Sequence, residues 1–183
     1  MRKSRGFTFV ELLVAVALIG IISAVTLPGF AGFLNGQKVN LAANNVYTAM
    51  QLTKASAIQQ NARMSLVLNP TLGSWCIFNR TEEPTSTTCS WTSNTLETGV
   101  LRKYIEPMPI GLAIAVLPAS ATQITYDGLG RVVPNSGVSA SATITSVAVT
   151  MPTDPGRANT VQLSNGIVRL CDPLKAVGDP QAC

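Results

Sequence analysis

The sequence predicts an α+β fold, in which a long N-terminal helix packs on an antiparallel β-sheet domain. Two observations lead to this prediction. The first 62 residues hold an apolar run followed by a segment with helical periodicity. The remainder consists of short β-branched or alternating runs, separated by stretches of Gly, Pro, Asn and Ser. One long helix followed by successive short strands is the pattern of an α+β protein.

The first element is an apolar run of 21 residues from Phe7 to Leu27. As a helix rising about 1.5 Å per residue, it is long enough to cross the hydrocarbon core of a bilayer. Arg2, Lys3 and Arg5 precede the run, and basic residues at the start of a span stay in the cytoplasm. We therefore expect a single transmembrane helix with the rest of the chain outside the cytoplasm.

Glu11 is the unusual residue of this run, because a carboxylate in a membrane segment costs about 2.5 to 3.5 kcal/mol on insertion scales. An ordinary secretory signal has a shorter apolar region and is cleaved after it. A plain membrane anchor explains the length of the run but not Glu11. The third alternative is a prepilin signal, which is cleaved before the apolar run. A carboxylate that merely reaches the lipid headgroups would not explain its spacing from the leader.

The stretch KSRGFTFVELLVAVALIGIISAVTLP resembles the N-terminus of type IV pilins and type II secretion pseudopilins. The resemblance implies that a prepilin peptidase removes the leader, residues 1–6, by cleavage after Gly6. Phe7 then becomes the N-methylated first residue, and Glu11 is the glutamate at the fifth mature position. Pro28 matches the helix-breaking proline that follows about one bilayer length later.

The same resemblance implies a location and a set of partners. Such a subunit resides first in the bacterial inner membrane and later in an extracellular pilus or a periplasmic pseudopilus. Its partners are other minor and major pilins, the prepilin peptidase and the inner-membrane assembly platform. The N-terminal helices of these filaments pack into a common core, where Glu11 is expected to pair with the amine of Phe7 from a neighbouring subunit or its own. Losing one partner of a buried pair costs about 3–5 kcal/mol, so Glu11 would act in assembly and not in catalysis.

The sequence divides the helix into an apolar half, residues 7–28, and an amphipathic half, residues 29–62. Pro28 and the glycine after it are expected to mark a kink or a local melt between the halves. At 100° per residue, the second half has one apolar stripe: Val39, Ala43, Val46, Met50 and Ala57. This stripe should pack on the globular domain, residues 63–183, whereas Leu41 and Leu52 point elsewhere or widen the buried face.

Composition argues against an enzyme. The chain has no histidine, which removes Ser-His-Asp, Cys-His and histidine–metal chemistry. Neither a phosphate-binding glycine motif nor a metal-ligand cluster is present in the sequence, so we expect no catalytic residues, no metal and no cofactor. The net charge of +4 falls to +1 without the leader, since 10 Lys and Arg then face 9 Asp and Glu. The basic character is thus mostly a targeting signal.

The four cysteines are Cys76, Cys89, Cys171 and Cys183. An even number in an exported domain indicates disulfides, and four cysteines allow three connectivities. We favour Cys76–Cys89 and Cys171–Cys183, because each bridge closes a short segment that contains turn residues. Such a bridge stabilises by about 3 kcal/mol in the chain-entropy model. Zinc ligation is the alternative, and these spacings do not favour it.

Eight short strands are expected after the helix: MSLVLN, SWCIFN, GLAIAVLP, QITYD, RVV, TITSVAVTM, TVQLS and GIVRLC. The segment NVYTAMQLTKASAIQQNARMSLVL, the Trp of GSWCIF and the end RANTVQLSNGIVRLCDP together resemble one branch of the pilins, the minor pilins and pseudopilins of the GspH/FimT/FimU type. Closest are the FimU-like subunits, which implies a minor pilin that primes type IV pilus assembly within a tip complex. The second alternative is a GspH-like pseudopilin of type II secretion.

The C-terminal hairpin is predicted in detail. Asn165-Gly166 between two strand runs indicates a type I′ turn. A two-residue loop then places Gln162 opposite Arg169, on the exposed face that also holds Ile167 and Cys171. The opposite, core face holds four aliphatic residues: Val161, Leu163, Val168 and Leu170.

This hairpin bears on a further alternative, a FimT-like receptor for DNA uptake in natural transformation. Such relatives have a GRxR-like motif in the hairpin, whereas this chain has Gly166-Ile167-Val168-Arg169. One arginine of the motif is therefore replaced by Ile167. Fewer phosphate contacts reduce both affinity and salt dependence. The candidate DNA-contacting residues are Arg169, Arg157, Arg131 and Lys175.

Overall fold

A computed structural model gives the structure of the chain. It describes residues 7–79, 89–93, 95–96, 99–105, 108–135 and 142–183. The side chains of residues 24–29 lie outside this description. The chain consists of two compact units, residues 1–35 and residues 36–183, each with its own internal contacts.

Helix α1 (Phe9–Gln60) is the first element and extends through both units. Its helical backbone is uninterrupted at Pro28, so the two halves belong to one helix as expected, and the local melt considered there is not observed. A proline removes one backbone hydrogen bond, and the bonds of the adjacent turns are enough to continue the helix. Asn61 directly follows the helix, and its φ of 48° is left-handed, as is typical of the residue after a helix C-terminus.

The part of α1 in the second unit buries the stripe expected from the periodicity. All five stripe residues are buried, at 2% exposure or less. Ala49 and Thr53 extend the stripe and were not expected; the Thr53 hydroxyl donates to the carbonyl oxygen of Ala49 at 2.7 Å, which satisfies it within the helix. Leu52 is partly buried against the core, whereas Leu41 is exposed. The buried face is therefore wider than the predicted stripe.

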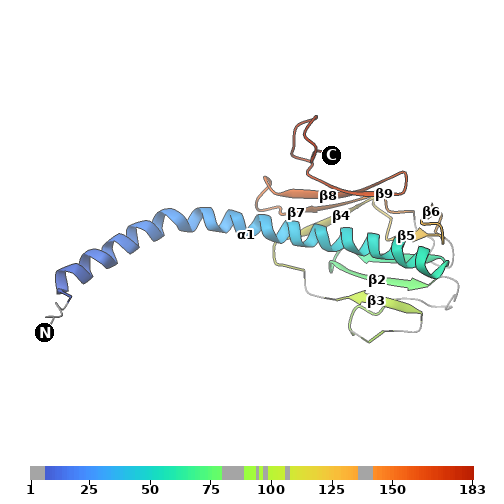
Figure 1. Ribbon diagram of the computed structural model, residues 1–183, viewed down its shortest axis with the longest axis horizontal. Coiled ribbons are helices and arrows are strands. Elements are labelled where there is room, and N and C mark those ends of the chain that lie inside the picture. The colour runs from blue at the N-terminus through green and yellow to red at the C-terminus, as the bar shows by residue number, and fades with distance from the viewer. Residues whose placement is uncertain (1–6, 80–88, 94, 97–98, 106–107, 136–141) are drawn as a thin grey trace, which may run out of the picture. The chain divides into compact units, whose positions relative to one another are not determined.

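The strands form two antiparallel sheets. The five-stranded sheet has the order β3-β2-β1-β5-β6, and the four-stranded sheet has the order β4-β7-β8-β9. The strands of the first are β1 (Met64–Asn69), β2 (Ser74–Asn79), β3 (Val100–Tyr104), β5 (Gln123–Tyr126) and β6 (Val132–Val133). Those of the second are β4 (Ala113–Leu117), β7 (Ser146–Thr150), β8 (Ala158–Ser164) and β9 (Ile167–Cys171). In Figure 1, β2 and β3 appear on one side of α1 and β7, β8 and β9 on the other.

One apolar core joins α1 to both sheets. Met50 of α1, Leu66 of β1, Ile124 of β5 and Val147 of β7 all belong to the same buried cluster. Strands from both sheets thus bury side chains in the same core as the helix. The α+β class predicted from the sequence is confirmed, with a long N-terminal helix on antiparallel sheets.

Candidate assembly interface

The N-terminus of α1 is capped by three hydrogen bonds between Thr8 and Glu11, which run in both directions. The backbone N–H of Thr8 donates to Oε2 of Glu11 at 2.9 Å, and the Thr8 hydroxyl donates to the same oxygen at 3.0 Å. In return, the backbone N–H of Glu11 donates to the Thr8 hydroxyl oxygen at 3.3 Å. This is a capping box, with Thr8 as the N-cap and Glu11 three residues later.

The capping box gives Glu11 a structural role within one chain. It satisfies two backbone donors that the first turn of any helix leaves free, and it places a negative charge at the positive end of the helix dipole. Thr8 was not among the residues predicted for this site, although a Thr three residues before a Glu is the signal for this motif. The pairing of Glu11 with a neighbouring amine stays a prediction, and Gly6 lies outside the described residues.

The first turns of α1 expose apolar side chains on every side. Eleven large apolar side chains before residue 24 are exposed: Phe7, Phe9, Val10, Leu12, Leu13, Val14, Val16, Leu18, Ile19, Ile21 and Ile22. A helix that is apolar all round is suited to an apolar surrounding and not to water. Over the part of the chain that the structure describes, no helix meets the combined length and hydropathy needed to cross a membrane.

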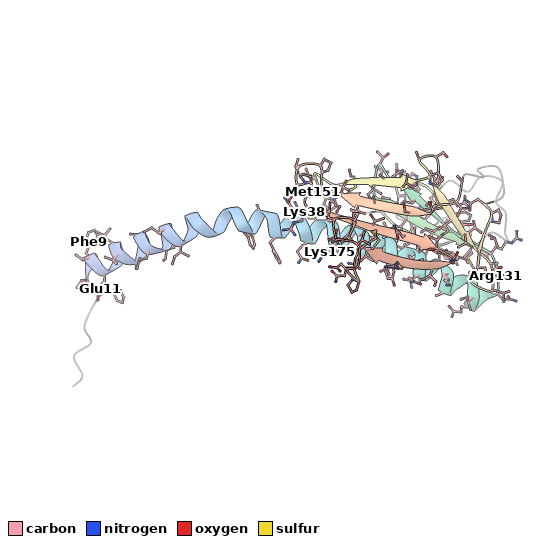
Figure 2. All side chains as sticks on the ribbon, turned by 90° about the horizontal axis from the view of Figure 1, so that it is seen from above. Phe9, Glu11, Lys38, Arg131, Met151 and Lys175 are labelled. Atoms are coloured by element: carbon pink, nitrogen blue, oxygen red, sulfur yellow. A yellow bond between two sulfur atoms is a disulfide. The ribbon has the colours of Figure 1, made fainter. Side chains whose placement is uncertain are left out.

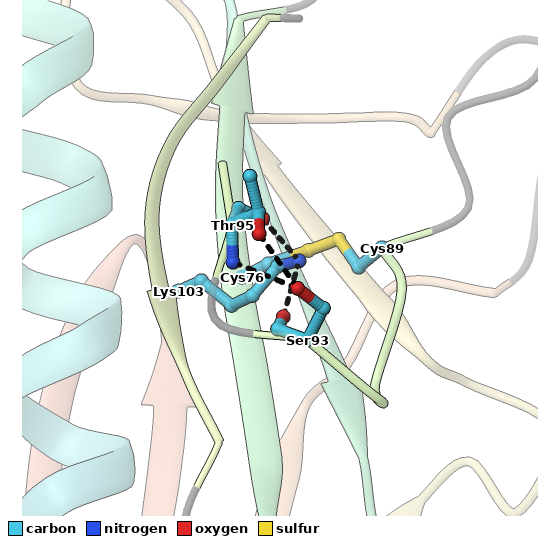
Figure 3. Close-up of a disulfide and its surroundings, with 5 residues drawn as sticks. All are labelled: Cys76, Cys89, Ser93, Thr95 and Lys103. Carbon is cyan, nitrogen blue, oxygen red and sulfur yellow. Dashed lines mark hydrogen bonds between the residues drawn. A yellow bond between two sulfur atoms is a disulfide. The ribbon is translucent and has the colours of Figure 1, made fainter. Parts of the chain in front are cut away.

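The disulfide Cys76–Cys89 joins β2 to the segment that leads toward β3. Its Cα atoms lie 6.4 Å apart, and Cys76 is opposite Lys103 in the β2–β3 ladder. Figure 3 shows the Lys103 ammonium beside the disulfide, where it donates to the carbonyl oxygens of Ser93 at 3.2 Å and Thr95 at 3.0 Å. Lys103 and the disulfide thus hold the same connection from two points, a role for Lys103 that sequence reasoning missed.

The disulfide Cys171–Cys183 closes the C-terminal segment on the end of β9, with Cα atoms 5.1 Å apart. Two backbone hydrogen bonds to Asp172 reinforce it: Asp172 N–H donates to the Gln181 carbonyl at 2.7 Å, and Cys183 N–H donates to the Asp172 carbonyl at 3.3 Å. Both disulfides have the connectivity favoured from the sequence.

The hairpin β8–β9 has the predicted register. Gln162 lies opposite Arg169, and Ser164 lies opposite Ile167. Asn165 and Gly166 both have positive φ, at 50° and 76°, as a type I′ turn requires. Arg169 and Ile167 are exposed, as expected for the outer face of the hairpin.

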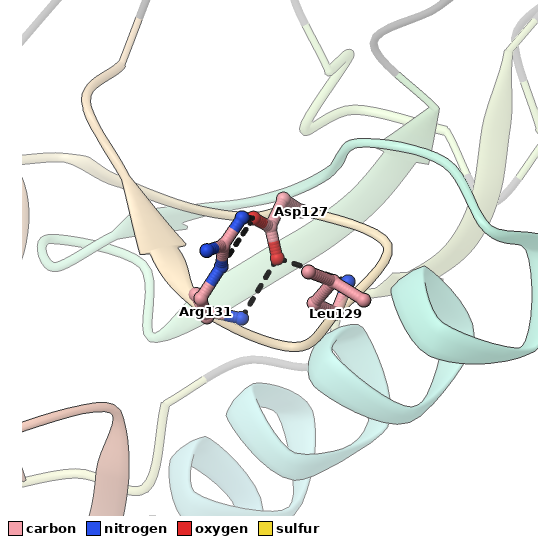
Figure 4. A network of polar contacts seen from close by, with 3 residues as sticks. All are labelled: Asp127, Leu129 and Arg131. Atoms are coloured by element: carbon pink, nitrogen blue, oxygen red, sulfur yellow. Dashed lines mark hydrogen bonds and ion pairs between the residues drawn. The ribbon is translucent and has the colours of Figure 1, made fainter.

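Arg131, another candidate for DNA contact, forms an ion pair with the carboxylate of Asp127. Its Nε and Nη2 contact Oδ2 of Asp127 at 2.9 and 2.8 Å, and its backbone N–H donates to Oδ1 at 2.9 Å (Figure 4). Leu129 N–H donates to the same Oδ1 at 3.0 Å. The backbone hydrogen bond from Arg131, followed by its side-chain hydrogen bond, lowers the pKa of Asp127. The pair stabilises the β5–β6 turn.

The other two cations lie elsewhere on the second unit. Lys175 contacts Oδ2 of Asp179 at 3.5 Å, and the pKa of Asp179 is lowered chiefly by a backbone hydrogen bond from Gln181. Arg157 lies over Gly36, with Nη1 3.5 Å from where a Cβ would be, and lines a groove of about 390 Å³. Figure 2 shows Lys175 and Arg131 well apart along the unit. The structure thus does not gather all four candidates into one groove.

A metal site finds no support among the residues described. No group of three or more Cys, Asp or Glu side chains there is close enough to hold a metal ion.

Two family models match separate parts of the chain. The model of the type II transport protein GspH matches residues 42–166, which is more than half of the chain. The prokaryotic N-terminal methylation motif matches residues 1–27. A curated relative, the type IV major pilin protein PilA of Myxococcus xanthus (strain DK1622), is 40% identical over 52 residues. That match covers 27% of this chain, and the chain spans about a quarter (24%) of the length of PilA.

Solved structures share the fold. The type IV minor pilin FimU of Pseudomonas aeruginosa (strain PAO1) has a TM-score of 0.54 at 18% identity, covering 82% of this chain and 98% of that one. The minor pseudopilin EpsH of the type 2 secretion system of Vibrio cholerae has a TM-score of 0.50 at 14% identity, covering 75% of this chain and 99% of that one. By its family model, its methylation motif and this shared fold, the chain belongs to the GspH family, a subunit of minor pilin or pseudopilin type with a structural function and not an enzymatic one.

Proposed function

We propose that the chain is a FimU-like minor pilin that joins a small complex near the tip of a type IV pilus and primes pilus assembly. The observation that supports this most is the start of α1, where a capped helix exposes apolar side chains all round its surface. Such a helix requires apolar neighbours, and the matching helices of other subunits would supply them in a filament.

Before assembly, the same surface would require a lipid surrounding. The three basic residues before the apolar run then orient the chain in the inner membrane, with residues 36–183 outside the cytoplasm. The prepilin peptidase would cleave after Gly6 and methylate Phe7. The assembly platform of the inner membrane would move the mature subunit from the lipid to the filament, where it contacts other minor and major pilins.

A GspH-like pseudopilin of type II secretion is the second candidate, because the family model and the fold of EpsH apply equally to that role. The two candidates require the same N-terminal helix and differ in the filament that receives the subunit. The features of α1 therefore support both candidate functions. The identity of the filament that contains the subunit distinguishes one from the other.

A DNA receptor is the third candidate, and the placement of its cations supports it least. Two of the four candidate residues, Arg131 and Lys175, already contact carboxylates. Ile167 occupies a hairpin position where the related receptors have arginine, so Arg169 is the one candidate cation on the outer face of the hairpin. Tight DNA binding requires several cations that converge on one groove or strand.

The experiment that tests the proposal is a deletion and complementation in the organism that encodes the chain. We expect loss of the full-length protein to reduce the number of surface pili, and the protein to appear in sheared pili at far below the abundance of the major subunit. Secretion of type II substrates should be unchanged. Normal piliation together with a secretion defect would instead assign the chain to a pseudopilus, and a defect confined to DNA uptake would favour the receptor.

A further inference from the structure

Three exposed aliphatic side chains belong to elements that approach one another where α1 finishes. They are Ile58 of α1, Leu129 of the β5–β6 turn and Ile167 at the start of β9, with exposed fractions of 50%, 70% and 62%. We name these three residues the distal patch. Figure 2 places Arg131, two residues after Leu129, at the opposite end of this unit from Lys38.

Contacts between the elements bring the residues of the distal patch to the same end of the unit. Gly130 approaches α1 so closely that a Cβ there would lie 2.8 Å from Cδ1 of Ile58 and 3.1 Å from Cε of Lys54. Lys54 Nζ in turn donates to the carbonyl oxygen of Gly166, beside Ile167, at 3.0 Å. The stem of Lys54 therefore lies between the two turns, next to the elements that hold the three aliphatic side chains.

The rim of the distal patch is positively charged. Arg63 follows the end of α1, Arg131 follows Leu129, and Arg169 shares the outer face of β9 with Ile167; all three are exposed. Asp127 is the only carboxylate in the described stretches 58–64, 127–133 and 164–169, and Arg131 is its partner. Among the contacts described, the side chains of Arg63 and Arg169 engage no carboxylate. The rim thus has an excess of positive charge around an aliphatic centre.

We propose that the distal patch is a docking surface for a neighbouring pilin-type subunit, whose contact surface presents aliphatic side chains surrounded by carboxylates. This inference rests on the proposed role in filament assembly. The positive charge of the rim favours a partner surface with negative charge, because complementary charges at a rim select the partner and speed its association. The aliphatic centre supplies the area removed from water.

Two other occupants fit the distal patch less well. Single-stranded DNA binds on aromatic platforms flanked by several cations, and Ile58, Leu129 and Ile167 offer no aromatic ring. A second copy of this chain would have to present its opposite end in a head-to-tail contact. That end has a polar groove lined by Asn40, Arg157 and other residues, and Arg157 would add positive charge to a rim that is already positive.

A photo-cross-linking amino acid at position 129 of the full-length protein, expressed in its own host, tests the proposal. After illumination, products are isolated from membranes and from sheared filaments and identified by mass spectrometry. We expect a cross-link to another protein with an N-terminal methylation motif, at a globular-domain peptide that contains Asp or Glu. Position 110 provides the matched control, since Ile110 is 94% exposed in the β3–β4 connection and lies outside the distal patch. The same product should be absent there.

Charge reversal provides the second arm. We expect the double substitution Arg63→Glu and Arg169→Glu to lower the yield of the position-129 product about tenfold, whereas Arg102→Glu, at an exposed cation of β3, should leave it unchanged. An unchanged yield in the double variant, a product with a second copy, or a product with DNA would each overturn the proposal. Because membranes are sampled as well, a chain that fails to enter filaments refutes the proposed function while the cross-link still reports on the distal patch.

Discussion

Lys54 donates a hydrogen bond from Nζ to the main-chain carbonyl of Gly166 at 3.0 Å, which ties the last third of α1 to the turn of the C-terminal hairpin. The two residues are 112 positions apart in the sequence. The hairpin turn has no other described side chain from α1 bound to its backbone. Lys54 therefore positions the exposed face of the hairpin, which holds Ile167 and Arg169, against the end of the helix.

Replacing Lys54 by methionine keeps most of the aliphatic stem and removes the donor. We expect Lys54→Met to lower the free energy of unfolding by about 1 kcal/mol, because the lost hydrogen bond has a charged donor but is only partly buried. Hydrogen exchange should become faster at the amides of β9 near the turn. Lys38→Met, at a partly exposed position of the same helix, serves as the control. Unchanged exchange in the hairpin would show that Lys54 does not restrain it.

The second prediction concerns processing. We expect the mature protein to begin at Phe7 with a methylated amine, since the leader before it ends in Gly6 and the apolar run follows directly. Intact-mass and N-terminal peptide measurements on protein from membranes and filaments check this. Gly6→Val should leave the leader attached and keep the chain out of filaments. Cleavage after Ala24, or an intact Met1 in filaments, would contradict the prediction.

The third prediction separates the two roles of Glu11. Glu11→Gln keeps an oxygen that can accept from Thr8 but removes the charge, whereas Thr8→Ala removes the hydroxyl of the cap and keeps the carboxylate. An N-cap contributes about 1 kcal/mol, and one half of a buried ion pair about 3–5 kcal/mol. We therefore expect Glu11→Gln to reduce the amount of protein in sheared filaments much more than Thr8→Ala does. Quantitative immunoblots of filaments and membranes measure both; a stronger defect in Thr8→Ala would make helix capping the main role of Glu11.

The fourth prediction is a pH dependence at the β5–β6 turn. Hydrogen bonds from Arg131 lower the pKa of Asp127 below its ordinary value, so the folded state binds this proton less readily than the unfolded state does. The contribution of the pair to stability is therefore complete above the ordinary pKa of an aspartate and is lost as the pH falls through the lowered one. Thermal unfolding between neutral and acidic pH should show a shallower acid loss for Asp127→Asn than for the parent protein. Parallel curves for the two proteins would contradict this linkage.

The sequence was most informative where local chemistry decides the structure. Asn165-Gly166 determined the turn and the register of the last hairpin, and the helical period identified Val46 and Met50 as buried. Strand β3 was missed because VLRKY has two adjacent cations, and its place in the sheet depends on pairing with β2. The division of the strands into two sheets was not predicted for a related reason: alternation shows which face of a strand is buried, but not which strands pair.

The functional surfaces also differ in whether local sequence or long-range contacts determine them. The capping box of Thr8 and Glu11 lies within four consecutive residues and could have been predicted from the sequence. It was not predicted, because Glu11 was assigned only to the pilin-type N-terminus. The distal patch could not be predicted, because α1, the β5–β6 turn and the hairpin turn approach one another only in the folded chain. Arg131 was a candidate for DNA contact until the fold placed Asp127 against it.

The last prediction tests the DNA-receptor alternative directly. The chain from residue 30 onward has 10 Lys and Arg against 8 Asp and Glu, and Arg169 is the one candidate cation on the outer face of the hairpin. We expect weak binding of duplex DNA by the full-length protein in detergent, with little change in Arg169→Ala. Ile167→Arg should strengthen binding and steepen the salt dependence by about 0.9 in the slope of log K against log salt, because it adds one phosphate contact. Gln162→Arg, opposite Arg169 on the same face, is the control for added charge away from the motif position. Fluorescence anisotropy across a salt series measures all four proteins. Tight binding by the parent chain that Arg169→Ala abolishes would place DNA uptake ahead of pilus priming as the function of this subunit.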